Sequence, residues 1–139
     1  MKFEVKWIGD TAFRADPPSG VSFVMDSHAE FGGSGSGPSP IETLLSSAAA
    51  CSGIDVLSIL KKKRQPVDSY TIEVSWERGP HGEWPRPITS VHLKHIVRGS
   101  GLSREAVERA VQLSDEKYCS VVATLRIATK VTSNYEIEP

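Results

Sequence analysis

Cysteine is scarce in this chain, and the chain has neither a strong imbalance of charge nor a long unbroken apolar run. Its 139 residues include two cysteines, with 16 basic and 17 acidic side chains giving a formal net charge of −1. A charge so close to zero provides no electrostatic basis for binding nucleic acid or an anionic membrane. The longest apolar run is interrupted by Ser and Gly, and we expect it to be too short to span a bilayer. These absences argue against nucleic-acid-binding and membrane-spanning classes of protein.

The start of the chain also lacks the features of a signal peptide. Residues 1–7 alternate between apolar and polar side chains, as a half-buried strand does. We therefore expect a cytoplasmic protein, in which thiols stay reduced and a disulfide is usually transient and catalytic. The length is typical of a single domain over residues 1–139, and an apolar fraction of 39% allows a hydrophobic core.

Three short strands are predicted at the start of the chain by alternating apolar residues and intervening turn residues. They cover residues 2–8, 11–15 and 21–25. The Gly- and Ser-rich segment 32–38 is predicted to be a flexible loop that leads into a helix. It lacks the lysine of a phosphate-binding loop, so we do not expect a nucleotide site there.

A long central helix is predicted to begin after Ser39 and to end at the basic cluster 61–64. Ser39 and Glu42 have the spacing of a capping box, and basic residues suit the negative end of the helix dipole. The alanines at 48–50 make the middle of this helix narrow, so other elements can approach closely beside Cys51.

The second half of the chain repeats the pattern of strands followed by a helix. Alternating apolar residues predict strands over 69–78 and 88–98, and Ser103 is the predicted N-cap of a second main helix. Final strands are predicted over 121–131 and 134–137. The order βββ-α-ββ-α-β indicates an α+β fold in which helices pack on antiparallel sheets.

The two thiols, Cys51 and Cys119, lie 68 positions apart, one inside the central helix and one after the second helix. Either one alone is consistent with an inert, small packing residue, but together they can be the two halves of a redox reaction. A thiol in the middle of a helix receives little stabilisation from the helix N-terminus, so a basic side chain must come from elsewhere in the fold. Polar residues interrupt the apolar face around the thiol: Ser46, Ser47, Ser52 and Asp55.

Other chemistries find little support in the sequence. Two cysteines at this separation match no zinc signature and are too few for a structural zinc site. His92 and His95 are three apart in a predicted strand and so point to opposite faces, while His28 and His81 fall in predicted loops. No Gly-x-Ser-x-Gly motif indicates a hydrolase. We expect no metal and no cofactor.

Two sequence motifs resemble those of the OsmC/Ohr superfamily. Pro-Ile-Glu-Thr-Leu-Leu at 40–45 and Ala-Ala-Ala-Cys-Ser-Gly-Ile-Asp-Val at 48–56 resemble its central helix, and Glu-Lys-Tyr-Cys-Ser-Val at 116–121 resembles its second cysteine motif. The order of elements also matches, and the resemblance covers nearly the whole chain. The run that begins at Cys51 is more similar to the less characterised OsmC-like branch than to the hydroperoxide-resistance branch.

The resemblance implies an OsmC-like α+β fold in an intertwined homodimer, with active sites at the subunit interface. It implies thiol-dependent reduction of organic hydroperoxides in oxidative stress defence, with Cys51 as the peroxidatic thiol and Cys119 as the resolving thiol. The disulfide formed between them would be reduced by an external dithiol, either a lipoyl-type or a small thiol.

The family also uses an arginine from the N-terminal strands, and a glutamate at the start of the central helix, to hold the thiolate. Arg14 and Glu42 are the candidates for these roles. In the hydroperoxide-resistance branch the glutamate directly follows the proline, and Ile41 occupies that place here. The alternatives are that Arg14 is an exposed charge at a strand end and that Glu42 belongs only to the capping box.

Two other interpretations of the whole chain remain open. One is a non-catalytic protein that keeps the OsmC fold and binds a small apolar ligand at the dimer interface. The other is a structural disulfide, against which the expected cytoplasmic location argues. The distance between the two sulfurs bears on this choice, because cysteines whose Cα atoms are more than about 7 Å apart cannot be bridged without backbone movement.

Overall fold

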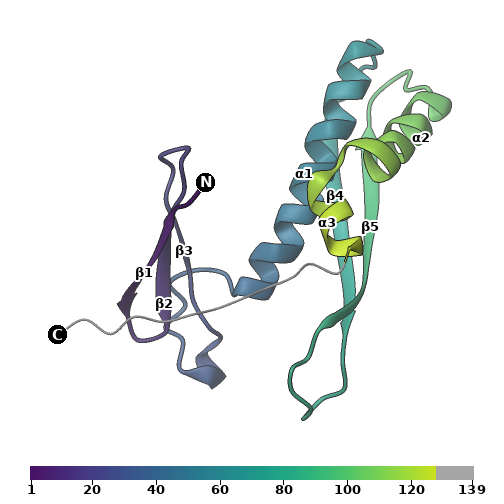
Figure 1. Ribbon diagram of the computed structural model, residues 1–139. Coiled ribbons are helices and arrows are strands. Elements are labelled where there is room, and N and C mark those ends of the chain that lie inside the picture. The colour runs from purple at the N-terminus through teal and green to yellow at the C-terminus, as the bar shows by residue number, and fades with distance from the viewer. Residues whose placement is uncertain (128–139) are drawn as a thin grey trace. The chain divides into compact units, whose positions relative to one another are not determined.

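A computed structural model describes residues 1–127, which form a mixed α+β structure with antiparallel sheets (Figure 1). This confirms the predicted fold class. By their internal contacts the described residues fall into two units, residues 1–47 with 76–91, and residues 48–75 with 92–127. The elements are β1 (Glu4–Gly9), β2 (Ala12–Asp16), β3 (Phe23–Met25), η1 (Ala29–Phe31), α1 (Pro40–Lys62), β4 (Ser69–Arg78), β5 (Ile88–Arg98), α2 (Arg104–Leu113), η2 (Ser114–Tyr118) and α3 (Ser120–Arg126).

The first unit contains the predicted three-strand meander. Its strands lie in the order β1-β2-β3, and each neighbouring pair is antiparallel. In this register Arg14 of β2 lies opposite Lys6 of β1 on one side and Val24 of β3 on the other. The meander therefore places Arg14 on its central strand, with another cation as its cross-strand neighbour.

The Gly- and Ser-rich loop of this unit is anchored on one buried carboxylate. Asp26 is 2% exposed and accepts hydrogen bonds from the Thr11 hydroxyl at 2.6 Å and from the backbone N–H groups of Ser27, Ser34 and Ser36 at 2.8, 3.0 and 3.2 Å. These donors hold the pKa of Asp26 well below its usual range. The loop that composition predicts to be flexible is thus fastened by specific contacts, which the sequence did not reveal because they span up to 15 positions.

Helix α1 begins with the predicted capping box. The Ser39 backbone N–H donates to Glu42 Oε2 at 2.7 Å, and the Glu42 backbone N–H donates to Ser39 Oγ at 3.2 Å. The helix runs for 23 residues and is long and apolar enough, by length and composition alone, to cross a membrane. The prediction that its apolar run is too short was therefore wrong. Val56 and Leu60 of this helix instead lie in a packed core, while Ile54 and Leu57 are exposed.

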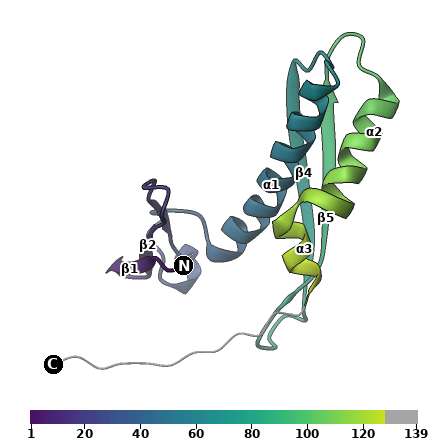
Figure 2. The ribbon, with the colours of Figure 1, turned by 45° about the horizontal axis from the view of Figure 1, so that its top comes forward.

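The core of the second unit lies between α1, α2 and the β4–β5 ribbon. Val56 and Leu60 of α1 are fully buried, and they cluster with Ala106 and Ala110 of α2. Figure 2 shows α1 and α2 on the same side of the ribbon. Apolar side chains from both helices and both strands complete the cluster, namely Ile59, Val67, Tyr70, Val97, Val107 and Val111.

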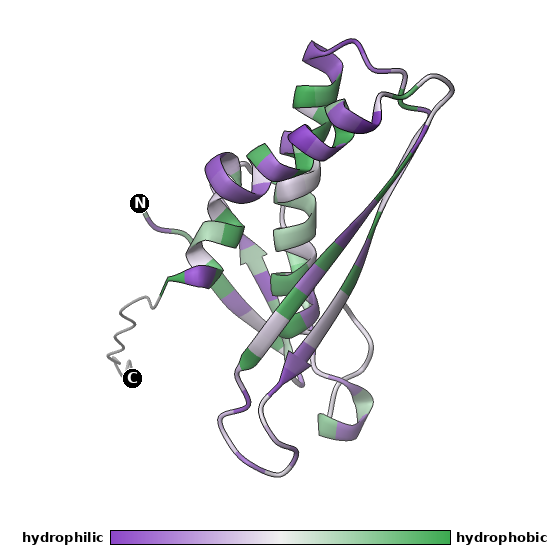
Figure 3. Ribbon diagram, turned by 90° about the vertical axis from the view of Figure 1, so that its right-hand side faces the viewer, coloured by the Kyte–Doolittle hydropathy of each residue, from purple (hydrophilic) through white to green (hydrophobic). Residues whose placement is uncertain are grey.

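Strands β4 and β5 have the bounds that the sequence predicts. Hydropathy alternates along both of them, as expected for a ribbon with one covered face (Figure 3). Helix α1 approaches this face closely at Gly53, where an added Cβ would lie 3.0 Å from the Cδ1 of Ile72. The absence of a side chain at Gly53 therefore leaves room for Ile72 of the ribbon against α1, two residues after Cys51.

The structure contradicts the predicted strand over 121–131 where it can be compared. Residues 120–126 form helix α3, whose N-cap is Cys119. Val121 and Val122 are β-branched and favour a strand by propensity, but a local cap together with the ion pair between Arg126 and Asp115 favours the helix. The remainder of this predicted strand, from 128, and the strand at 134–137 lie outside the described residues.

Candidate functional site

The two thiols lie close together within the second unit. The Sγ atoms of Cys51 and Cys119 and a carboxylate oxygen of Asp55 all lie within 4.8 Å of one another. Both cysteines are free in the structure. Tertiary structure thus joins two positions far apart in the sequence, which is the arrangement expected for a pair of thiols that form and release a disulfide.

Two elements, η2 and α3, set the position of Cys119. It follows η2, a π-helical turn, and its backbone N–H donates to the carbonyl oxygen of Ser114 at 2.9 Å. Its Sγ in turn accepts the backbone N–H of Val122 at 3.4 Å, which makes Cys119 the N-cap of α3. Arg126 at the end of α3 donates to the carboxylate and the carbonyl of Asp115, at 2.7 and 2.8 Å, and so ties α3 back to η2.

The two thiols differ in their surroundings. Cys119 is 3% exposed, whereas Cys51 is only half-buried, in the α1 segment that follows the three alanines. Burial raises the pKa of the Cys119 thiol, the N–H of Val122 opposes that shift, and the nearby Cys51 sulfur adds to it. Cys119 therefore carries its proton at neutral pH, while Cys51 is the thiol that a second molecule can reach.

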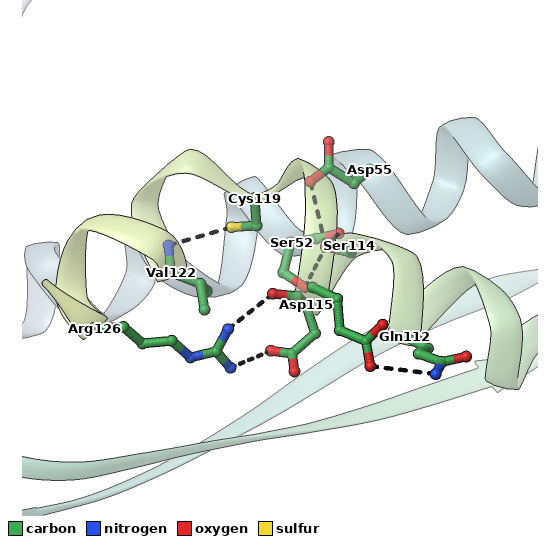
Figure 4. A network of polar contacts seen from close by, with 9 residues as sticks. Ser52, Asp55, Gln112, Ser114, Asp115, Cys119, Val122 and Arg126 are labelled. Carbon is green, nitrogen blue, oxygen red and sulfur yellow. Dashed lines mark hydrogen bonds and ion pairs between the residues drawn. The ribbon is translucent and has the colours of Figure 1, made fainter.

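A buried hydroxyl pair holds the third member of the cluster. The Oγ atoms of Ser52 and Ser114 lie 3.0 Å apart, and the Ser114 Oγ lies 3.3 Å from Asp55 Oδ2. Figure 4 shows this chain of contacts running from α1 to η2 and back to α1. Sequence reasoning noted Asp55 only as a polar interruption and missed Ser114. The available signal was the four-residue spacing of Cys51 and Asp55, which places both on one face of a helix.

The other two predicted site residues lie in the first unit, each with local partners. The Arg14 guanidinium donates to the carboxylate of Asp16, with Nε to Oδ1 at 2.9 Å. Glu42 accepts from Ser39 in the capping box, which lowers the pKa of its carboxyl, and its Oε1 lies 3.8 Å from Nε2 of His28. Their roles in holding a thiolate stay predictions.

The thiol cluster also contains the atoms that a metal would need. Cys51, Cys119 and Asp55 offer two sulfurs and one oxygen, one ligand fewer than the four of a structural zinc site. The expectation of no metal rested on cysteine and histidine spacing alone and did not consider Asp55. That expectation stays a prediction.

Comparison with known proteins gives a consistent family. The model of the family described as OsmC-like protein matches residues 33–134. Protein YhfA of Escherichia coli K12 is 43% identical over 138 residues, which cover 99% of this chain and 98% of that protein.

Solved structures agree with this result. The crystal structure of a hypothetical protein from Aquifex aeolicus superimposes with a TM-score of 0.75 at 33% identity, covering 90% of this chain and 86% of that one. An organic hydroperoxide resistance protein, OsmC, from Legionella pneumophila shares the fold with a TM-score of 0.64 at 16% identity, covering 91% of this chain and 90% of that one. The chain therefore belongs to the OsmC-like protein family.

Proposed function

We propose that this protein is a thiol-dependent peroxidase that reduces organic hydroperoxides. The observation that carries the proposal is the convergence of the Cys51 and Cys119 sulfurs, within 4.8 Å of each other. Family membership supports it, as does the fold shared with the hydroperoxide resistance protein from Legionella.

The difference between the thiols assigns their order of action. Cys51 is the more accessible sulfur, so its thiolate attacks the outer oxygen of R–O–O–H and breaks the O–O bond. Cys51 becomes a sulfenic acid, and the alkoxide takes a proton and leaves as R–OH. The buried Cys119 sulfur then attacks the Cys51 sulfur, forms the disulfide and releases water. An external dithiol reduces the disulfide to two thiols and is itself oxidised.

The Cys51 thiolate requires a positive partner, because its mid-helix position gives little help from the α1 dipole. We assign that role to Arg14, oriented by Glu42, as in the resemblance to the superfamily. Glu42→Gln is an informative variant here, since glutamine is equally suited to the third position of a capping box but carries no charge. If Glu42→Gln loses peroxide reduction but not stability, then Glu42 orients Arg14 in addition to capping the helix.

The setting of the reaction follows from the same proposal. We assign the protein to the cytoplasm, as a homodimer whose reductant is a lipoyl-type or small dithiol. No nucleic acid or membrane is needed for the reaction.

Peroxide consumption by cysteine variants tests the proposal. With cumene hydroperoxide and dihydrolipoamide, wild type is expected to turn over, and Cys51→Ser is expected to lose activity to the uncatalysed level. Cys119→Ser should still react once and should then accumulate the Cys51 sulfenic acid, which dimedone traps for mass spectrometry. If wild type and Cys51→Ser consume peroxide equally slowly, the proposal fails, and the non-catalytic, ligand-binding alternative takes its place.

A further inference from the structure

Asp55 is the charged residue of the thiol cluster, and the proposed reaction as written above gives it no task. It lies one helical turn after Cys51 on α1, so the two side chains share a face of the helix. One of its carboxylate oxygens lies within 4.8 Å of both sulfurs. A carboxylate beside two thiols requires an explanation, because it opposes the formation of a thiolate on either of them.

Hydrogen bonds from buried groups fix the position of the Asp55 side chain. Ser114 is fully buried and Ser52 is 4% exposed, so neither hydroxyl can turn to solvent for a partner. A hydroxyl has one proton to donate. Both hydroxyls are satisfied when Ser52 donates to Ser114 at 3.0 Å and Ser114 shares its proton between the Asp55 carboxylate and the Ser52 carbonyl oxygen, each at 3.3 Å.

Ser114 also connects Asp55 to the resolving thiol. Its hydroxyl faces Asp55, while its carbonyl oxygen accepts the backbone N–H of Cys119 at 2.9 Å across the π-helical turn. Such single π turns often occur at functional sites. One buried residue thus fixes both the carboxylate and the thiol relative to α1.

Formation of the disulfide requires a proton transfer, and a nearby carboxylate can carry that proton. The resolving sulfur must lose its S–H proton as it attacks, and burial keeps that proton on Cys119. The hydroxyl on Cys51 must gain a proton in order to leave as water. Both requirements are met when one group accepts the first proton and supplies the second. The step then balances with no added oxidant, since Cys51 sulfenic acid and Cys119 thiol yield disulfide and water.

We propose that Asp55 carries this proton, accepting it from the Cys119 thiol and delivering it to the hydroxyl leaving Cys51, while Ser114 holds the carboxylate in place. The inference rests on the proposed peroxidase function and adds a residue to its second step. Asp55 takes no part in the first step, because a negative charge beside Cys51 disfavours the attacking thiolate.

Step-resolved kinetics of Asp55→Asn test the inference. Single-turnover reactions with cumene hydroperoxide are quenched with dimedone, and the sulfenic and disulfide forms are counted by mass spectrometry. Wild type should form the Cys51 sulfenic acid and convert it rapidly to disulfide. Asp55→Asn should form the sulfenic acid at least as fast and convert it about 10²-fold more slowly, the usual contribution of a positioned acid–base group. Asp55→Glu, which keeps the carboxylate, should recover part of the rate.

Glu116→Gln is the matched control, since Glu116 is an exposed carboxylate of the same π-helical turn and contacts Gln112 at 3.2 Å. It should leave both steps unchanged. Equal disulfide rates in wild type and Asp55→Asn would overturn the inference, and so would an equal slowing of both steps, which indicates a purely structural role. A wild type that forms neither sulfenic acid nor disulfide would instead overturn the proposed function, and the inference with it.

Discussion

At the level of single residues, burial shifts the pKa values of Tyr70 and His95, which contact each other. The Tyr70 hydroxyl is hydrogen-bonded to Nδ1 of His95, and the rings stack with an interplanar angle of 25°. Burial raises the pKa of Tyr70 to about 12, so its hydroxyl is protonated and donates, and Nδ1 accepts. Burial also lowers the pKa of His95, although the nearby Asp115 opposes that shift. The folded protein therefore favours a neutral imidazole.

A pH dependence of stability follows from this pair. Because the folded pKa of His95 lies below the ordinary 6.5, the unfolded chain binds a proton more readily. The stabilisation is present above pH 6.5 and is lost as the pH falls through the folded pKa. His95→Asn, whose side-chain oxygen can still accept from Tyr70, should lose less stability than wild type between pH 7.5 and 5.

Urea unfolding at the two pH values measures this difference. His81→Asn is the control, because His81 is exposed in the turn between β4 and β5, and it should retain the pH dependence of wild type. An unchanged pH dependence in His95→Asn would contradict the assignment.

At the level of secondary-structure elements, a close backbone contact determines how the end of β5 lies against the start of β4. Gly99 follows β5, and a Cβ added there would lie 1.7 Å from the carbonyl oxygen of Pro66, which precedes β4. The neighbouring backbone bond from Asp68 N–H to the Arg98 carbonyl measures 2.8 Å. The ribbon can close at this end only because position 99 has no side chain.

Gly99→Ala should therefore destabilise the protein by about 3 kcal/mol, near the upper end for inserted volume in a packed site. Gly101 is a matched control. It has a φ of +80° with nothing within 4 Å of an added Cβ, so Gly101→Ala carries backbone strain of about 1 kcal/mol without a clash. Thermal and urea unfolding of both variants should rank Gly99→Ala as the less stable. If Gly101→Ala were the less stable variant, the backbone at Pro66 would have to shift at little cost in free energy.

At the level of the whole molecule, a large amount of apolar surface is uncovered. Trp7 on β1 is 66% exposed, and Ile54 and Leu57 on α1 are 68% and 44% exposed. Single exposed apolar residues are ordinary, but several on one sheet and one helix are typical of an interface. They are consistent with the homodimer that we propose. Further exposed apolar residues of the meander are Phe3, Val5, Phe13 and Phe23.

Light scattering coupled to gel filtration tests the dimer. Wild type is expected to elute with twice the chain mass, and Ile54→Lys is expected to weaken association by at least about tenfold, because a buried unpaired charge costs more than 1.4 kcal/mol. Gln112→Lys adds the same charge at an exposed position on α2, away from this face of α1, and should remain dimeric. A monomeric wild type at micromolar concentration would contradict the proposal.

The sequence predicted those parts of the fold that depend on neighbouring residues. The Ser39–Glu42 capping box and the bounds of β4 and β5 were confirmed because caps and alternation act within a few positions. The strand predicted from 121 was wrong because helix α3 depends on Arg126 reaching Asp115, eleven positions away. Asp26 and Ser114 were not found from the sequence, since Thr11 and Asp55, which contact their side chains, lie 15 and 59 positions away.

For the site, the sequence alone determined that two thiols exist, that one sits within a helix beside small residues, and that their motifs resemble those of a redox family. Only the tertiary structure decided that these thiols meet, that Cys119 is the buried one, and that Asp55 and Ser114 join them. The physical reason is the packing of α1 against α2 and the π-helical turn η2. Short-range patterns specify elements, whereas the distance between Cys51 and Cys119 depends on how the core closes around Val56 and Leu60.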